Sequence, residues 1–172
     1  MGKAFNFLSI LLTLISLSAK ADFLDVKANK TPKWSRLSLS YGRATSEALE
    51  SSSNFNGASF KNIRGNFVYG LEYSFIYQKK DQIKSTSMSL GFRPDWNLEV
   101  EPSLDVIFGL SDRKKEMASE GTNISLQLSL DFFKGPFYST TISYRRGFYE
   151  FDQQSKSLSI QSVLFGVNVD FY

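Results

Sequence analysis

The feature that most constrains this chain is a two-residue alternation of apolar side chains with polar or small ones, which recurs along most of its length. Successive side chains of a β-strand point to opposite faces, so each such segment predicts a strand with one apolar face. No convincing helical period is present, and after the N-terminal region no apolar run is long enough for a transmembrane helix. Seven segments show the alternation clearly, at residues 37–42, 66–77, 85–92, 97–110, 123–133, 137–148 and 163–172.

The first 21 residues have the features of a secretory signal peptide. An early Lys3 is followed by an apolar run over 4–17 and by the small residues Ala19 and Ala21. This arrangement predicts cleavage after Ala21, with residues 1–21 removed during export. The alternative is an N-terminal membrane anchor, which we disfavour because the apolar run is short for a bilayer span and the cleavage site is well formed.

Cysteine and histidine are both absent from the sequence. Without cysteine the chain has no disulfide framework, no lipoprotein attachment site and no thiolate nucleophile. Without histidine it lacks the usual base of a serine or cysteine nucleophile and the commonest metal ligand. The signal peptide holds two of the 20 basic residues and none of the 17 acidic ones, so the mature chain is nearly neutral. We therefore expect no nucleic-acid partner, no metal and no cofactor.

The composition of the two strand faces favours a membrane barrel over a soluble β-sandwich. A sandwich exposes polar faces, on which Lys and Glu are common, and packs large apolar groups inside. Here the polar faces carry mostly Ser, Gly, Asn and a few carboxylates, while the apolar faces are long and rimmed with Tyr and Phe. Those features, together with an export signal, are typical of bacterial outer-membrane barrels. We therefore predict an all-β fold, an eight-stranded antiparallel transmembrane outer-membrane β-barrel over 34–172, with 22–33 as a periplasmic N-terminal segment.

The strand count and the connections complete this prediction. A bacterial barrel has an even number of strands, so an eighth is required; we prefer 53–63, despite its poor alternation, over 22–29. The parity of the last strand slips near Gln161 and Ser162, which predicts a β-bulge there. Both termini of such a barrel are periplasmic, and its outer loops are longer than its periplasmic turns. On this basis we expect outer loops at 45–52, 79–83, 111–122 and 149–157, and periplasmic turns at 93–97 and 133–136.

The last segment, 163–172, is predicted to close the barrel against the first strand. Its alternating, aromatic-ended sequence is typical of the signal that the barrel-assembly machinery reads, so this machinery is an expected partner. We expect a monomer surrounded by outer-membrane lipid and lipopolysaccharide, whose phosphates the charged run 112–116 could meet. The residues expected to face lipid on the closing strand are Phe165, Val167, Val169 and Phe171.

Charged residues on the polar faces form the main candidate cluster. One interpretation makes them an acid–base pair or an ion path. The other, which we favour, is that a narrow barrel fills its interior with paired arginine and carboxylate groups, because a buried charge without a partner is costly. A continuous pore is not expected in a barrel of eight strands. The predicted inward residues are Glu72, Glu99, Glu101, Asp105, Asp131 and Arg145, together with Arg64.

Two segments of the second half resemble the lipid A deacylase barrels (PagL-like, acyloxyacyl hydrolase). They are "LGFRPDWNLEVEPSLDVIFGLSD" at 90–112 and "ISYRRGFYEF" at 142–151. The family has a similar hairpin followed by a "YRxxHxSNA"-like segment that holds the catalytic His and Ser. The resemblance covers 66–172 and depends mainly on strand order. A resemblance to the OmpX and opacity-type eight-stranded barrels is equally tenable.

The catalytic motif of that family is incomplete here. If Tyr144 and Arg145 match its start, Phe148 stands where the His belongs and Glu150 where the Ser belongs. Glu150 and Ser143 are therefore only weak catalytic candidates, with Glu99 or Glu101 as the base for Ser143. We expect a small outer-membrane barrel without enzymatic activity, with a structural or surface-interaction role. The alternatives are a lipid A-modifying enzyme of deacylase type and a soluble periplasmic β-domain.

Overall fold

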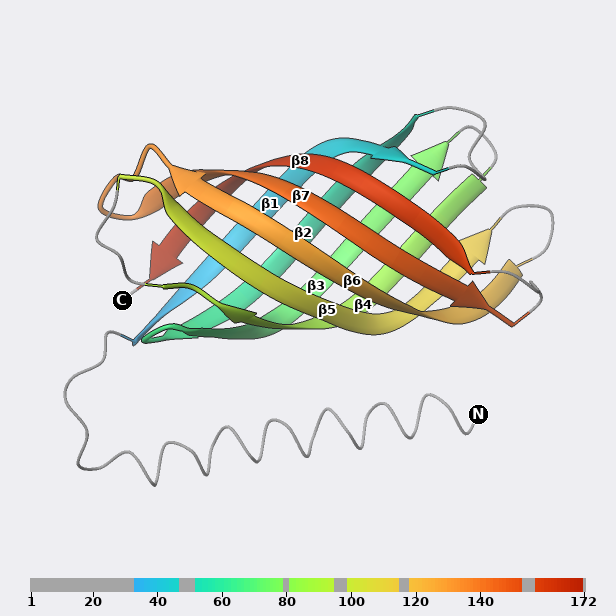
Figure 1. Cartoon of the computed structure of the whole chain (residues 1–172), viewed down its shortest axis with the longest axis horizontal. Helices are drawn as coiled ribbons and strands as arrows, with labels where there is room; N and C mark the ends of the chain where they lie inside the picture. Colours follow the sequence, from blue (N-terminus) through green and yellow to red (C-terminus); the bar gives the residue numbers. More distant parts are fainter. Residues whose placement is uncertain are drawn as a thin grey trace, which may run out of the picture. The chain divides into compact units, whose positions relative to one another are not determined.

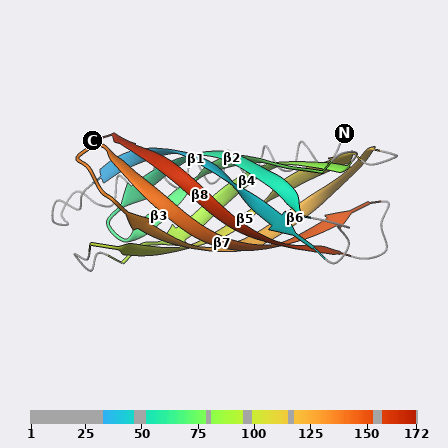
Figure 2. The ribbon, with the colours of Figure 1, turned by 90° about the horizontal axis from the view of Figure 1, so that it is seen from above.

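The computed structural model describes residues 33–46, 52–78, 81–94, 99–114, 118–152 and 157–171. Each strand in this part of the chain pairs antiparallel with the next, and β8 pairs with β1, so the sheet closes into a barrel (Figures 1 and 2). The eight strands are β1 (Lys33–Thr45), β2 (Ser53–Arg64), β3 (Phe67–Gln78), β4 (Asp81–Phe92), β5 (Glu101–Lys114), β6 (Ala118–Phe132), β7 (Tyr138–Phe151) and β8 (Leu158–Phe171).

This architecture confirms the predicted eight-stranded antiparallel barrel. Among the described residues, no helix is long and apolar enough to cross a membrane. The expected signal peptide lies outside the described residues, as does nearly all of the segment 22–33. The second strand is the preferred candidate of the two, β2, whereas 22–29 also lies outside the described part.

The strands are strongly staggered around the barrel. Successive register pairs lead from Ser35 once around the wall and return to β1 at Thr45, ten residues further along the strand. In a barrel of eight strands, a stagger of this size requires strands tilted by roughly 35–45°. This tilt is visible in Figure 1. The same closure leaves no unpaired sheet edge.

The two ends of the barrel are named here by the chain ends. At the terminal end, β1 begins, β8 ends, and three connections span 65–66, 93–100 and 133–137. The tightest of them contains Gly65 at a φ of 56°, a left-handed backbone conformation that glycine adopts at little cost. At the opposite end the connections span 46–52, 79–80, 115–117 and 152–157.

The predicted connection lengths are wrong in several places. The expected outer loops at 79–83 and 111–122 are largely strand, because the ladders of β3–β4 and β5–β6 continue in unbroken register. In the expected loop at 149–157 only the first three residues are strand, because β7 extends to Phe151. At the terminal end, β5 starts at Glu101, so the connection from β4 is longer than the expected turn at 93–97. The turn expected at 133–136 is confirmed to within one residue. The two ends therefore have connections of similar length.

The predicted β-bulge in the last strand is also wrong. The pairing of β8 with both neighbours is continuous through Gln161 and Ser162. Leu158 and Ile160 point into the barrel and are buried, so the strand keeps one parity throughout. The sequence pattern suggested a bulge because the apolar side chains of β8 point inward at this end of the barrel and mostly outward in the rest of the strand.

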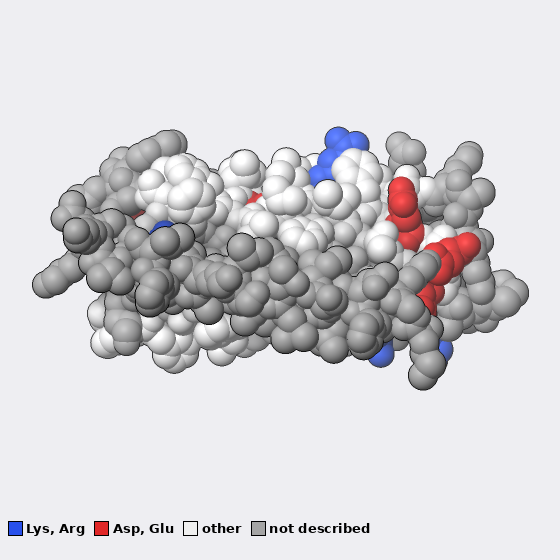
Figure 3. Space-filling view, turned by 90° about the horizontal axis from the view of Figure 1, so that it is seen from below, with Lys and Arg blue, Asp and Glu red and all other residues white. Residues whose placement is uncertain are grey.

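The outward faces form an apolar band around the barrel. Phe165, Val167, Val169 and Phe171 are 40–58% exposed on the outside, as predicted for the closing strand. Toward the opposite end the outward residues become polar or charged, as with Asp112 and Glu120. On the face in Figure 3, uncharged side chains predominate among the described residues, and the larger acidic patches gather toward the opposite end.

Candidate functional site

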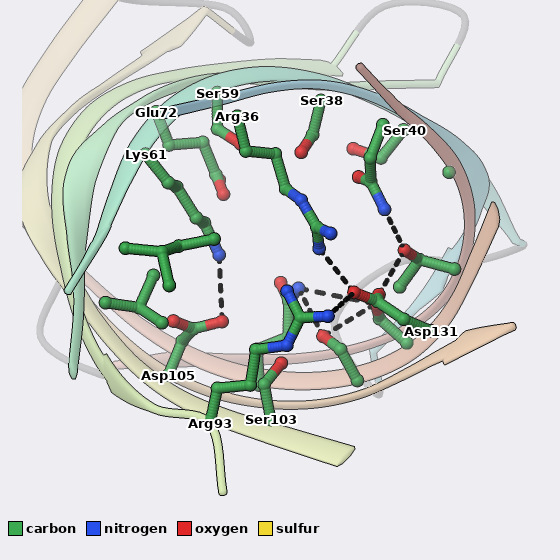
Figure 4. Close-up of a pocket in the computed structure, with 18 of the residues that line it drawn as sticks. Arg36, Ser38, Ser40, Ser59, Lys61, Glu72, Arg93, Ser103, Asp105 and Asp131 are labelled. Carbon is green, nitrogen blue, oxygen red and sulfur yellow. Dashed lines mark hydrogen bonds and ion pairs between the residues drawn. The ribbon is translucent and has the colours of Figure 1, made fainter. Parts of the chain in front are cut away.

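The terminal half of the barrel interior is built around Arg36. Its Nε donates to Asp170 Oδ1 at 2.7 Å and its Nη2 to Asp170 Oδ2 at 3.1 Å, while Nη1 pairs with Asp131. Asp131 also accepts a hydrogen bond from Thr141 Oγ1 at 2.6 Å. Because β1, β6, β7 and β8 each supply a partner, this cluster connects strands across the lumen (Figure 4).

Arg93 extends the same network toward the mouth of the terminal end. It pairs with Glu101 and lies 3.4 Å from Asp131, and Lys134 also pairs with Glu101. The guanidinium groups of Arg36 and Arg93 lie 4.8 and 4.9 Å from the ring centroid of Trp34. Cations at this distance are attracted to the ring quadrupole. The terminal mouth is therefore closed by two arginines that both contact one tryptophan.

A second ionic layer lies deeper in the barrel. Arg145 donates both terminal nitrogens to Glu72, at 2.5 and 2.6 Å, in the bidentate geometry that guanidinium and carboxylate groups favour. Its Nε donates to Gln127 Oε1 at 2.8 Å, and its guanidinium lies 4.9 Å from the ring of Phe55. Lys61 pairs with Asp105 at 2.8 Å. Lys61, Glu72, Asp105, Gln127 and Arg145, together with the network of Arg36 and Arg93, are called the ionic half.

A small cavity remains between these groups. Its volume is about 60 Å³ and its wall includes Arg36, Lys61, Glu72 and Asp105. A buried water needs roughly 10–15 Å³ of such space, so the cavity has room for a few waters but not for a channel. Asp105 Oδ1 is buried there without a hydrogen-bonding partner among the described residues, and a water in the cavity would satisfy it. A Cβ at Gly91 would lie 2.1 Å from this oxygen, so only glycine leaves room for the carboxylate.

The opposite half of the interior contains an apolar cluster. It is filled by side chains from β1, β2, β3, β4, β7 and β8, all of them at most 4% exposed. On the β4–β6 side, serine and asparagine groups line the wall, and Asn123 Nδ2 donates to Ser111 Oγ at 2.6 Å. The cluster comprises Ala44, Phe55, Ile76, Ile83, Tyr149, Phe151, Leu158, Ile160 and Leu164.

Most of the predicted charged residues lie together in the ionic half. Glu72, Asp105, Asp131 and Arg145 are buried there, and Glu101 is half-buried at the terminal mouth. Two predictions are wrong. Glu99 precedes β5 and is exposed, because the strand starts at Glu101, four residues later than the predicted segment 97–110. Arg64 lies on the outward side of β2, where its guanidinium is 5.8 Å from the ring of Tyr69.

Several cations of the ionic half were not predicted from the sequence. Arg36 directly precedes the first predicted strand, and extending that alternation by one residue would have placed it inward. Arg93 follows β4 with the same inward parity but was assigned to a turn. Lys61 lies on β2, whose alternation is obscured by outward-facing asparagines such as Asn54 and Asn56. The inward cations could have been inferred from the predicted inward carboxylates, because buried carboxylates require a similar number of cations as partners.

The weak catalytic candidates do not come together. Ser143 is buried, and its Oγ donates to Ser129 Oγ at 2.9 Å and accepts from Gln127 Nε2 at 3.3 Å. Glu150 is exposed on the outward side of β7, so the two residues face opposite sides of the wall. The expected bases are also elsewhere: Glu101 pairs with Arg93 and Lys134, and Glu99 is exposed. In the described ranges no three His, Cys, Asp or Glu side chains are grouped so that they could hold a metal ion.

Comparison with known proteins supports the fold at low sequence identity. No family model matches the sequence, and no curated protein is similar to it. Among solved structures, neisserial surface protein A (NspA) is similar with a TM-score of 0.67 and 13% identity, covering 80% of this chain and 96% of that one. The N-terminal β-barrel domain of Pseudomonas aeruginosa OprF follows at 0.56 and 12%, covering 79% and 97%. The chain thus has the fold of small outer-membrane barrels.

The outer-membrane enzyme PagL is also similar, with a TM-score of 0.51 and 10% identity, covering 78% of this chain and 98% of that one. This similarity supports the small-barrel part of the resemblance noted from the sequence. It extends to the fold and not to a specific deacylase, since NspA and OprF share the same fold.

Proposed function

We propose that this protein is a non-enzymatic barrel of the outer membrane, exported by a cleaved signal peptide, with a structural or surface-interaction role. The observation that carries the proposal is the outward apolar band. Leu39, Leu71, Leu126 and Val167, on four different strands, are each about half exposed, within a belt of exposed apolar residues around the wall. Water-soluble monomers rarely expose continuous apolar patches above a few hundred Å². A bilayer core covers such a band at no cost.

The filled interior supports a role that does not involve transport. The ionic half and the apolar cluster occupy the lumen from the terminal mouth to the opposite end, and the cavity within the ionic half holds a few waters at most. Surface partners would then be met by the opposite end of the barrel, including the charged run 112–116. We propose that the terminal end faces the periplasm, that the closing strand engages the barrel-assembly machinery, and that the protein is a monomer in contact with lipopolysaccharide.

Cell fractionation combined with gel mobility tests the proposal. The expected result is recovery in the outer-membrane fraction and a band that shifts between unheated and boiled samples, because a lipid-inserted barrel stays folded in detergent until it is heated. Recovery in the soluble periplasmic fraction, with one mobility before and after boiling, would contradict the proposal and favour the soluble β-domain.

Lipid A modification is the alternative function, and the fold shared with PagL is the observation behind it. Ester hydrolysis by a serine requires a neighbouring base, and among the described residues Ser143 hydrogen-bonds to Ser129 and Gln127 and not to a carboxylate. We therefore expect the same lipid A mass spectrum from cells with and without the inserted protein. Loss of an acyl chain that depends on Ser143 or Glu150 would establish the alternative.

A further inference from the structure

Two outward arginines differ from the cations of the interior. Arg36, Lys61, Arg93 and Arg145 each pair with a carboxylate inside the barrel. By contrast, Arg43 and Arg146 are exposed on the outside and form no ion pair among the described residues. Arg43 and Arg146 are therefore available to a ligand on the outer surface.

Both arginines lie toward the opposite end of the apolar band, although the exposed Phe148 follows Arg146 on the outward face of β7. Arg43 follows Leu37, Leu39 and Tyr41 on the outward face of β1, and Arg146 follows Ile142 and Tyr144 on that of β7. These apolar and aromatic residues are all exposed. If the band lies in the hydrocarbon core, as proposed above, the two guanidiniums lie at the depth of the lipid headgroups. Long basic side chains at this depth extend toward the headgroup region.

The two arginines also flank the same strand. Arg43 is opposite Val163 of β8, and Arg146 is opposite Gln161 of that strand. Neighbouring strands are about 4.8 Å apart, so the two residues are separated by roughly 10 Å across the sheet. No carboxylate occupies the register positions between them. The guanidinium of Arg146 is further positioned over Phe148, 5.4 Å from the ring centroid.

Most groups around β8 at this level are hydrogen-bond donors or amides, although the exposed Val163 lies between Arg43 and Tyr144. They comprise two guanidiniums, two phenols and one amide, and we call them the β8 patch. Such a set suits the oxygens of a phosphate group, which guanidinium binds in bidentate fashion. Below the patch, Phe165 and Val167 offer an exposed apolar surface for acyl chains. The patch consists of Tyr41, Arg43, Tyr144, Arg146 and Gln161.

We infer that the β8 patch binds the phosphate of an anionic lipid headgroup, whose acyl chains lie along the outward face of β8. This inference depends on the proposed membrane insertion and adds a specific lipid site to it. The other side of the barrel provides a matched comparison. Lys84 lies opposite Asp112 in register, so that cation already faces a carboxylate.

The test uses the full protein in phosphatidylcholine nanodiscs with an acyl-labelled phosphatidylglycerol as the probe. The variants Arg43→Gln/Arg146→Gln and Arg146→Gln are compared with Lys84→Gln, which removes one charge from an exposed position elsewhere on the barrel. We expect the first variant to weaken probe binding by about fivefold per arginine, since a basic residue near an anionic membrane surface contributes about 1 kcal/mol. Lys84→Gln should change binding by less than about twofold, because Lys84 lies opposite Asp112 in register and away from the β8 patch.

Equal loss in Arg146→Gln and Lys84→Gln, or no loss in the double arginine variant, would overturn the inference. Labelled phosphatidylcholine is the headgroup control, and equal affinity of the wild-type protein for both probes would also overturn it. Insertion is measured separately, by the heat-dependent gel shift in phosphatidylcholine vesicles. A wild-type chain that inserts but does not prefer phosphatidylglycerol refutes the lipid site alone, whereas a chain that fails to insert refutes the proposed function and the site with it.

Discussion

The two halves of the barrel interior are filled by different chemistry inside one continuous wall. In the ionic half, charges from strands on opposite sides meet in pairs such as Arg145 with Glu72. In the opposite half, Phe55, Ile160 and their neighbours pack as an apolar core, beside the ion pair of Arg113 with Asp81. The ionic half therefore depends on every partner being present, whereas the apolar cluster depends on shape and volume. Substitutions that separate these two dependences test the comparison.

The largest expected effect is the loss of one interior charge. Arg145→Met leaves Glu72 buried without its partner and should lower the free energy of unfolding by about 3–5 kcal/mol. Replacing both residues, as Arg145→Met/Glu72→Met, should recover most of that loss, because a buried ion pair is often exchanged for apolar groups at little cost. Urea unfolding in phospholipid vesicles measures both variants. A double variant no more stable than the single one would show that the pair is not an isolated unit.

The apolar cluster should respond to volume and not to partners. Ile160→Ala removes buried methyl groups beside Phe55 and Leu164 and should cost about 2–5 kcal/mol, whereas Ile160→Val should cost about 0.5–1.5 kcal/mol. The same urea experiment applies, with the exposed neighbour Gln161→Ala as control and an expected change within about 0.5 kcal/mol. If Gln161→Ala were the more damaging change, the inward and outward assignments of β8 would be reversed.

On the outward face, the cost of a substitution should depend on whether the residue contacts lipid and not on which half of the interior lies behind it. Val167→Arg places a charge in the apolar band and should cost about 2–4 kcal/mol, the range for Arg near a bilayer midplane. Gln161→Arg, on the same face of β8 but beyond the band, should cost about 0–1 kcal/mol. The folded fraction after refolding into vesicles reports both. Equal tolerance would mean that residue 167 does not face the hydrocarbon core.

The sequence predicted the ionic half much better than the apolar cluster. Asp131 and Arg145 alternate with apolar outward residues, so a two-residue period revealed them. Leu158 and Ile160 are apolar and inward on a strand whose outward residues are apolar too, and the same period then suggested a bulge. Arg113 and Tyr149 were assigned to loops for a related reason: beyond the lipid the outward residues become polar, and the contrast between the faces is lost.

The pairing of charges could be expected from the sequence but not the identity of the partners. Glu72 and Arg145 are 73 residues apart and meet only because the barrel closes. The stagger of ten residues, which determines which side chains share a level, follows from eight ladders together. No single segment carries that information.

The smallest expected effect concerns a single neutral hydrogen-bonding group of the ionic half. Ser143→Ala removes the hydrogen bonds to Ser129 and Gln127 and should cost about 1 kcal/mol. Urea unfolding gives the stability, and lipid A spectra of the same cells should be unchanged. A loss as large as that of Arg145→Met would mean that the interior is one cooperative network in which neutral groups matter as much as charges.

All of these effects depend on β1 closing against β8 in the observed register. The sequence contains no cysteine, so two introduced cysteines can react only with each other within one chain. Leu39 and Val167 are directly opposite on the outward face, within the Cα separation of about 4.4–6.8 Å that a disulfide requires. Oxidation of Leu39→Cys/Val167→Cys in the membrane should give a crosslinked chain of altered mobility after boiling without reductant. Leu39→Cys/Val163→Cys, displaced by four residues along β8, should stay uncrosslinked. Failure of the first pair, or equal crosslinking of both, would contradict the closed barrel.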